Sequence, residues 1–256
     1  MMIDYHSWIL QSTSASHIPK RLRLFCFSCA GGNAASFIPW QYALEPDIEL
    51  CAIQLPGRGE SLGAPTVRSF SELMDRLAPA VARAATLPFA FFGHSLGGLV
   101  AFELARRFQS DGGRMPFKLL IAGCDRPRNR KPPLRLHHLD DDARLQALRE
   151  LGGTSPEILE NRDLMDLAMP SIVGDFALLS GYRYNPGRLL DTPLTLMLGR
   201  DDQHVDRQTA MSWQEETVEP MTTHWFDGGH FFIHSQREAV IDCVRSELTQ
   251  WNDLCR

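Results

Sequence analysis

The segment Pro88–Leu99 reads PFAFFGHSLGGL and joins an apolar run to a helical pattern through a G-x-S-x-G motif. The motif is weak alone, but a strand before it and a helix after it form the setting of a nucleophile elbow. Gly93 and Gly97 leave the space that this sharp turn requires. The turn aims the Ser95 hydroxyl at the start of the helix, where the helix dipole favours negative charge. We therefore predict that Ser95 is a nucleophile and that His94 packs within the elbow.

Apolar runs and helical patterns alternate along the rest of the chain. Apolar runs of this length suit strands buried on both faces, and hence a mainly parallel sheet. The predicted strands are Leu22–Phe27, Glu49–Leu55, Pro88–Gly93, Phe117–Gly123, Pro193–Gly199 and Thr223–Gly228, and the predicted helices include Ser69–Ala85, Leu96–Phe108 and Arg237–Trp251. The alternation predicts an α/β fold with right-handed crossovers, in a single domain over residues 1–256.

The stretch 126–184 interrupts this alternation. It begins as RPRNRKPPLRLHHLDDD, polar and rich in proline, and continues in helical patterns without a clear strand. Ligands of open α/β sheets bind beyond the carboxyl ends of the strands. We therefore predict a helical insertion that covers this edge of the sheet.

Composition excludes several classes of protein. The chain has 256 residues, 44% of them hydrophobic, and a net charge of −5, which suits one large core and does not favour nucleic-acid binding. No apolar run approaches the ~18 residues of a membrane span. The N-terminal residues lack the basic start and apolar run of a secretory signal. The six cysteines lie mostly in apolar surroundings, so we expect reduced thiols and a cytoplasmic protein.

A serine hydroxyl needs a base that removes its proton. In α/β-hydrolases the partners follow in the order Ser, Asp or Glu, His. We predict His230 in FDGGHFF as the base, because it follows a late strand and a Gly-Gly loop that can bring the ring over the elbow. His224 lies in that strand and His234 beyond the loop, so we expect both to be structural.

The carboxylate that orients the base should follow the strand PLTLMLG. Its role is to hold the imidazole tautomer and stabilise the imidazolium. Asp201 and Asp202 both stand there. We prefer Asp202, because its spacing to Val205 is typical of hydrolase strands, and Asp201 remains the alternative. His204 is expected at the surface.

A tetrahedral intermediate also needs two backbone donors. We predict the amides of Leu96, after the nucleophile, and Ala30, in the early loop SCAGG, where Gly31 lets the backbone curl close to a substrate. Cys26 and Cys29 form a C-x-x-C pair just before this AGG turn. Cys26 belongs to a buried strand, and no second pair completes a zinc site, so neither redox nor metal chemistry is expected.

Several motifs occur together in one order. They are AGG at 30–32, QLPGRG at 54–59, FGHSLGG at 92–98, ELGGTSPEIL at 150–159, GRDD at 199–202 and FDGGHFF at 226–232. Together they resemble the type II thioesterases that accompany nonribosomal peptide and polyketide synthetases, over residues 22–251. The resemblance implies an α/β-hydrolase that cleaves acyl thioesters from the phosphopantetheine arm of carrier proteins, without a metal or other cofactor. The insertion would be the family's lid.

The resemblance also implies partners and substrate contacts. The partners would be acyl carrier proteins or peptidyl carrier domains, with no nucleic acid and no membrane, and we expect a monomer. The predicted substrate contacts are Cys29, Gly31, Met169, Phe176 and Phe231, although Leu159, Leu164, Met165, Met169 and Phe176 could equally pack within the lid. Ser28-Cys29 departs from the proline and aromatic or histidine that many relatives carry, which leaves the acyl preference open. The basic cluster Arg126, Arg128, Arg130, Lys131 and Arg135 is either a solvated face or a docking site for an acidic carrier or the phosphate of its arm.

Other functions are compatible with the same residues. They are a medium-chain fatty-acyl carrier thioesterase, a general carboxylesterase, an acyltransferase and, in another class, a non-catalytic scaffold that binds carrier proteins. QLPGRG and ELGG argue against a general esterase, and the intact Ser95, Asp202 and His230 argue against a scaffold.

Overall fold

A seven-stranded sheet forms the centre of the molecule, with strand order β1-β3-β2-β4-β5-β6-β7. The computed structural model describes residues 8–11 and 18–249. The strands are β1 (Ile9–Gln11), β2 (Leu22–Phe27), β3 (Ile48–Ile53), β4 (Phe89–His94), β5 (Leu119–Ala122), β6 (Leu194–Gly199) and β7 (Thr222–Phe226). Only β1, at the edge, pairs antiparallel among these strands.

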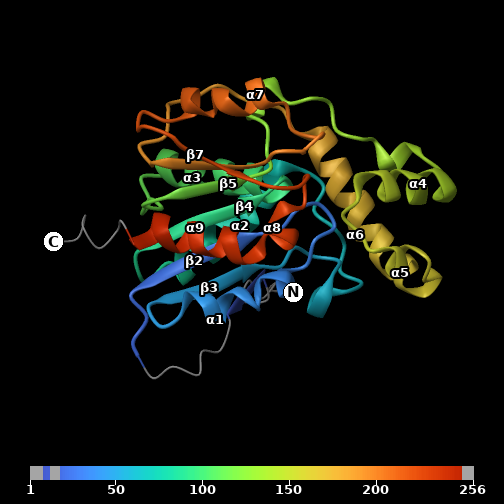
Figure 1. Cartoon of the computed structure of the whole chain (residues 1–256), viewed down its shortest axis with the longest axis horizontal. Coiled ribbons are helices and arrows are strands. Elements are labelled where there is room, and N and C mark those ends of the chain that lie inside the picture. Colours follow the sequence, from blue (N-terminus) through green and yellow to red (C-terminus); the bar gives the residue numbers. More distant parts are fainter. Residues whose placement is uncertain (1–7, 12–17, 250–256) are drawn as a thin grey trace.

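Helices cover both faces of the sheet (Figure 1). The α-helices are α1 (Trp40–Leu44), α2 (Phe70–Ala84), α3 (Leu96–Ser110), α4 (Asp141–Leu151), α5 (Pro156–Leu159), α6 (Arg162–Gly181), α7 (Arg207–Met211), α8 (Phe232–Ser235) and α9 (Arg237–Thr249). Short 3-10 helices are η2 (Ala34–Phe37), η3 (Gly59–Ser61), η4 (Pro127–Asn129), η5 (Leu136–His138) and η6 (Ser212–Glu216). The layers form the predicted α/β-hydrolase architecture.

Alternate side chains of the strands fill two separate cores. Phe25 and Phe91 pack with α2 and α3 on one face, whereas Leu24 and Phe92 pack with α1 and α9 on the other. Successive side chains of a strand point to opposite faces, and both faces here are covered by apolar helices. The central strands are therefore apolar at most positions. Their parallel pairings confirm the prediction of a mainly parallel sheet.

The predicted elements agree with the structure apart from their ends. The six predicted strands are present, with ends shifted by at most two residues, and the antiparallel β1 was not predicted. The predicted helix Arg237–Trp251 is described to Thr249 as α9, and its last two residues lie outside the described part. Residues 1–7, which bear on the prediction of no secretory signal, also lie outside it.

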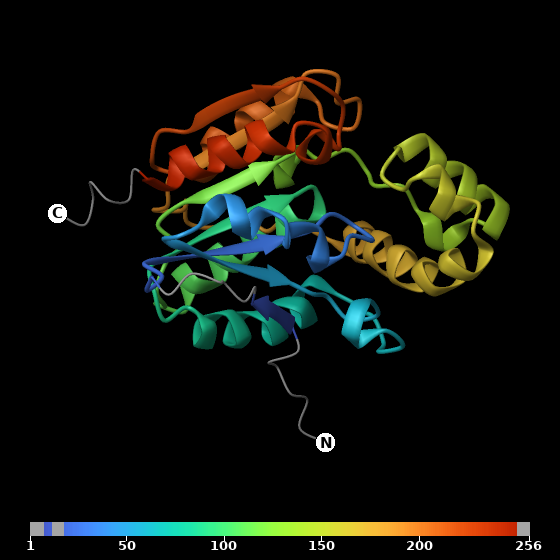
Figure 2. The ribbon, with the colours of Figure 1, turned by 60° about the horizontal axis from the view of Figure 1, so that its bottom comes forward.

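The chain between β5 and β6 is helical in the structure. It contains η4, η5, α4, α5 and α6, and Figure 2 shows α4–α6 beyond the ends towards which the parallel strands point. These helices have an apolar cluster of their own, formed by Leu136, Leu148, Leu159, Met165 and Ile172. The insertion therefore has its own small core over the carboxyl edge of the sheet.

The helix α6 qualifies the expectation about membrane spans. By length and composition alone, its 20 residues could cross a membrane. In the structure, however, α6 buries Asp175 in an ion pair with Arg58 and Ile172 in the apolar cluster of the insertion. Other apolar residues of α6, such as Leu164 and Leu167, are exposed.

Candidate active site

Ser95 lies at a strained turn between β4 and α3. Its φ of 55° and ψ of −116° make it the one non-glycine residue with positive φ in the described part of the chain. A Cβ atom at Gly93 would lie 2.2 Å from the Gly97 carbonyl oxygen, and one at Gly97 would lie 2.1 Å from that of Phe27. Only glycine fits at these two positions, and strain of this kind is typical of functional sites. The local geometry is that of a nucleophile elbow.

His230 and Asp202 form a hydrogen-bonded pair. Asp202 Oδ2 lies 2.8 Å from His230 Nδ1, and Asp202 Oδ1 accepts bonds from the amides of His204 and Val205. Burial raises the pKa of Asp202, but the hydrogen bond and charge of His230 and the two amides outweigh it and leave the pKa below its ordinary value. Asp201 is exposed. The structure therefore brings Asp202 to His230.

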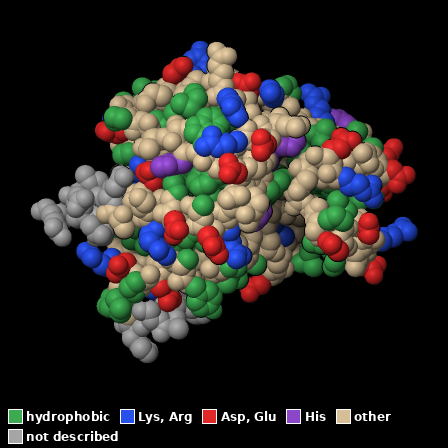
Figure 3. Space-filling view, viewed as in Figure 1, with side chains coloured by type: hydrophobic (Ala, Val, Ile, Leu, Met, Phe, Trp, Pro, Cys, Tyr) green, Lys and Arg blue, Asp and Glu red, His purple; other side chains and the backbone are tan. Residues whose placement is uncertain are grey.

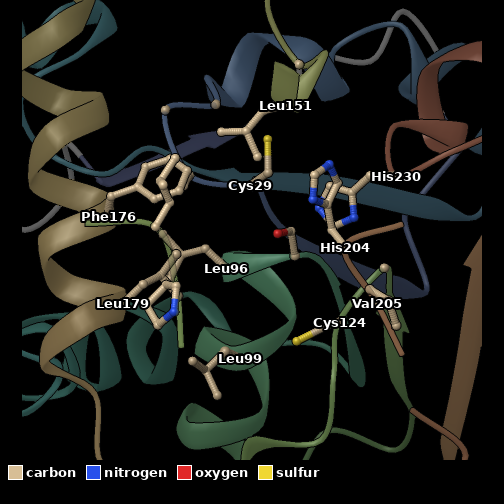
Figure 4. A pocket seen from close by; sticks show the side chains of 18 of the residues that line it. Cys29, Leu96, Leu99, Cys124, Leu151, Phe176, Leu179, His204, Val205 and His230 are labelled. Carbon is tan, nitrogen blue, oxygen red and sulfur yellow. The ribbon is translucent and has the colours of Figure 1, made fainter. Parts of the chain in front are cut away.

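Two further histidines surround this pair. The buried His94 has its Nε2 2.9 Å from the His230 carbonyl oxygen, and burial lowers its pKa to about 3. The neutral ring therefore donates to the loop that carries His230. His204 is exposed, as predicted, but its ring centroid also lies 5.2 Å from that of His230 (Figure 4). Neither contact was predicted from the sequence.

A cavity of about 370 Å³ opens beside the elbow. It is lined by Ser95 from the turn before α3, by Leu96 from the start of α3 and by His230 from the loop after β7. In Figure 4, Phe176 and Leu179 project from α6 on the side opposite His230. Figure 3 shows the crevice between the body and the lobe of α4–α6, with histidine at its edge.

Most of the predicted substrate contacts line this cavity. They are Cys29, Gly31, Phe176 and Phe231. Met169 is not among the lining residues and packs in the apolar cluster of the insertion, which is the alternative that the sequence left open. It lies two turns before Phe176, about 10 Å along the helix axis, where α6 packs against η5 and α5. Other residues of the insertion line the cavity as well, namely Leu148, Leu151, Ile172 and Leu179.

The two predicted oxyanion donors also border the cavity. Leu96 is the first residue of α3, so its amide has no carbonyl four residues earlier within the helix to bind. Ala30 lies in the loop after β2, where Gly31 has a φ of +72° and the Gly32 amide donates to the Cys29 carbonyl. This tight turn presents backbone close to Ser95, at the edge of the same cavity.

The C-x-x-C pair is reduced and lies partly in the cavity wall. Cys26 is fully buried in β2, whereas Cys29 lines the cavity, and both are free. Burial, with a smaller contribution from Asp175, raises the pKa of Cys29 to about 11. A thiol at neutral pH suits a wall of the cavity. No group of three or more His, Cys, Asp or Glu that could hold a metal ion occurs within residues 8–11 and 18–249.

The sequence analysis assigned no role to Arg58 and Asp175. Arg58, in the QLPGRG motif, makes two hydrogen bonds of 2.6 and 2.7 Å to the carboxylate of Asp175 in α6. The Asp175 carboxylate also accepts from the amide of Gly31 at 2.7 Å. The arginine of the motif QLPGRG is visible in the sequence, but its partner Asp175 lies 117 residues further along the chain.

The basic cluster divides into two parts. Arg126 is only 4% exposed and its Nε lies 2.6 Å from Glu216 Oε1, so it is neither a solvated nor a docking residue. The other members of the cluster line a groove together with Arg183; they are Arg128, Arg130, Lys131 and Arg135. No Asp or Glu is among the residues that line this groove. Arg130 and Lys131 also line the cavity at Ser95, so the groove continues into it.

The sheet order, the serine elbow at the end of β4 and the helical insertion define an α/β-hydrolase. A family model described as the thioesterase domain matches residues 22–248, and the chain belongs to this family. It is 32% identical over 229 residues to the gramicidin S biosynthesis protein GrsT of Aneurinibacillus migulanus, covering 89% of each chain.

Two further relatives give the same result. Thioesterase PikA5 of Streptomyces venezuelae is 31% identical, with 96% of this chain and 87% of PikA5 covered. The solved structure of the type II thioesterase BorB from the borrelidin biosynthetic cluster superposes with a TM-score of 0.86 at 34% identity. That superposition covers 97% of this chain and 99% of BorB. The resemblance to type II thioesterases is confirmed.

Proposed function

We propose that this protein hydrolyses acyl thioesters carried on the phosphopantetheine arm of carrier proteins in a nonribosomal peptide or polyketide assembly line. The observation that carries the proposal is the convergence of the Ser95 elbow and the His230–Asp202 pair on one largely apolar cavity. The named relatives in antibiotic biosynthesis support the assembly-line context. The role is the removal or release of carrier-bound acyl groups.

The reaction proceeds through an acyl-enzyme. Ser95 Oγ attacks the thioester carbonyl while His230 Nε2 takes its proton, and Asp202 stabilises the imidazolium through Nδ1. The amides of Ala30 and Leu96 hold the oxyanion. The C–S bond then breaks, and the phosphopantetheine thiolate leaves with the proton from His230. Water attacks the acyl-enzyme with His230 again as base, which releases the acid and restores Ser95.

We assign residues 126–184 as a lid over this cavity and a carrier protein as the partner that delivers the substrate. Leu151 and Phe176 of the lid offer apolar surface to the acyl group. The thioester on the phosphopantetheine arm, the triad and water are the reacting groups of this scheme. The scheme therefore uses no cofactor. A cytoplasmic monomer stays the prediction from the sequence.

The test is mass spectrometry of a panel of acyl-loaded carrier proteins with and without the enzyme. Ser95→Ala is expected to abolish deacylation, and Asp202→Asn to lower it by about 10²–10⁴-fold, because the base loses its orienting carboxylate. Asp201→Asn is the matched control and should retain activity within about twofold, since its side chain is exposed.

Three outcomes would contradict the proposal. Deacylation by Ser95→Ala at the wild-type rate excludes the acyl-enzyme scheme. Faster turnover of simple oxygen esters than of carrier thioesters indicates a carboxylesterase. Failure of a fluorophosphonate probe to label Ser95 indicates the non-catalytic scaffold.

A further inference from the structure

The ion pair between Arg58 and Asp175 joins three segments that are distant in sequence. Arg58 follows β3, Asp175 lies in the middle of α6, and both contact the loop after β2 that contains Ala30. Their side chains are only 7% and 4% exposed. A buried pair of charges costs desolvation that its attraction does not always recover, so stability alone is a weak reason for its presence.

The pair holds two backbone groups that follow Ala30, the amide of Gly31 and the carbonyl of Gly32. Asp175 Oδ2 accepts from the Gly31 amide at 2.7 Å, and Arg58 Nη1 donates to the Gly32 carbonyl at 3.1 Å. These bonds share atoms with the ion pair, since the same Oδ2 also accepts from Nη1 at 2.6 Å. The position of the loop backbone is therefore tied to the position of α6.

Packing strengthens this connection. A Cβ atom at Gly31 would lie 2.7 Å from Cγ1 of Ile172, one turn before Asp175 on α6. The lid helix thus lies directly against the loop, with no space for a larger residue between them. Arg58 Nε is buried without a hydrogen-bond partner in the described part of the chain, so the guanidinium is placed by its Asp175 and Gly32 contacts.

We propose that Arg58 and Asp175 are positioning residues that set the Ala30 oxyanion donor only when the lid helix is seated. The inference rests on the proposed function, because it concerns the oxyanion site of that reaction. Neither residue touches the reacting atoms. A carrier-bound substrate that seats α6 thereby completes the site, and displacement of α6 withdraws the Gly31 peptide and with it the neighbouring Ala30 amide.

The test separates positioning from stability by replacing both charges together. Arg58→Met/Asp175→Leu removes the ion pair without leaving an unpaired buried charge, so the fold should be retained. We expect kcat on a small acyl thioester to fall by about 10- to 100-fold, somewhat less than the loss of a whole oxyanion donor. KM should stay within about threefold and the pH profile unchanged, because His230 and Asp202 are untouched.

A second buried pair provides the matched control. Lys118 and Glu247 lie 2.7 Å apart and are 8% and 5% exposed, but neither lines the cavity. Lys118→Met/Glu247→Leu should change the melting temperature without changing kcat of the folded enzyme. A boronic acid that forms an adduct with Ser95 should bind the Arg58→Met/Asp175→Leu variant more weakly by the same factor as the loss in kcat.

Three results overturn the inference. One is a folded Arg58→Met/Asp175→Leu variant with kcat within twofold of wild type. Another is a loss of kcat that the Lys118→Met/Glu247→Leu control reproduces, which indicates a structural role alone. The third is a shifted pH profile, which places the effect at His230 instead of the oxyanion loop. Absence of thioesterase activity in the wild-type protein contradicts the proposed function and not this coupling.

Discussion

His94 stands next to the nucleophile and is fully buried under the His230 loop. Its Nε2–H donates to the His230 carbonyl, and its Nδ1 has no partner in the described part of the chain. Burial is the main reason why its pKa is lowered to about 3. The residue supports the base through this backbone contact, which the neutral ring makes with its Nε2–H.

The lowered pKa makes His94 a source of acid sensitivity. The unfolded chain binds a proton at the ordinary pKa of 6.5, whereas the folded protein binds it only near 3. The contribution of His94 to the free energy of unfolding is therefore fully present above pH 6.5. It is lost as the pH falls towards 3, by about 1.4 kcal/mol per pH unit. We expect His94→Gln to make the free energy of unfolding depend less steeply on pH between about pH 4 and 6.5. The measurement is denaturant titration at several pH values.

His138→Gln is the control for this experiment, because His138 is exposed on the lid. It should leave the pH dependence of unfolding as in the wild type. A slope for His94→Gln equal to that of the wild type would show that the pKa of His94 does not change on folding.

At the scale of elements, both ends of the insertion 126–184 bind one carboxylate. Arg126, before η4, lies with Nε 2.6 Å from Glu216 Oε1, and Tyr184, after α6, donates to Glu216 Oε2 at 2.7 Å. Glu216 is itself buried at the end of η6. These bonds fix where the insertion leaves and rejoins the sheet, while α4–α6 lie beyond the strand ends.

We expect Glu216→Gln to lower the free energy of unfolding by about 3 kcal/mol, because it leaves the buried Arg126 without its buried partner. Glu215→Gln is the matched control. Glu215 also pairs with Arg126, but its side chain is 65% exposed, so its loss should cost less than about 1 kcal/mol. Equal effects of the two substitutions in denaturant titrations would refute the central role of Glu216.

Local patterns predicted most elements but not the contacts between them. The structures of the strand Leu22–Phe27 and of the elbow at Ser95 depend on adjacent residues. Both could therefore be predicted from the sequence. The three-residue β1 is too short to show a pattern. The sequence offered Met169 and Phe176 alike as substrate contacts, because it does not show how far along α6 the cavity extends.

The contacts that were missed join distant segments. The pairing of Arg58 with Asp175 spans 117 residues, and that of Arg126 with Glu216 spans 90. A single sequence gives the charge of each residue but not its partner. Arg126 was therefore predicted only as a member of a basic cluster. The motif QLPGRG supported the resemblance to the family, but no function was predicted for its arginine.

At the scale of the whole molecule, charge is unevenly distributed. The net charge is −5, yet the groove beside the lid is lined by Arg128, Arg130, Lys131, Arg135 and Arg183 without an acidic residue. The groove shares Arg130 and Lys131 with the cavity at Ser95. An acidic partner drawn to this groove would therefore hold its arm at the entrance of the cavity.

We expect Arg128→Glu/Arg135→Glu to lower kcat/KM on acyl-carrier substrates by about tenfold at low salt, and by less at high salt, because both side chains are exposed and act through long-range attraction. Turnover of small acyl thioesters should not change, since neither residue lines the cavity. The measurement is steady-state kinetics with both substrates over a range of salt concentrations.

The control must separate local docking from net charge. Arg237→Glu/Arg245→Glu introduces the same change of net charge on α9, which packs on the face of the sheet opposite α2 and α3. If docking is local, this control keeps carrier turnover within about twofold, because screening at physiological salt limits charge effects to roughly 8 Å. Equal losses in both double variants would assign the effect to net charge, and unchanged carrier turnover in the groove variant would leave the groove a solvated face.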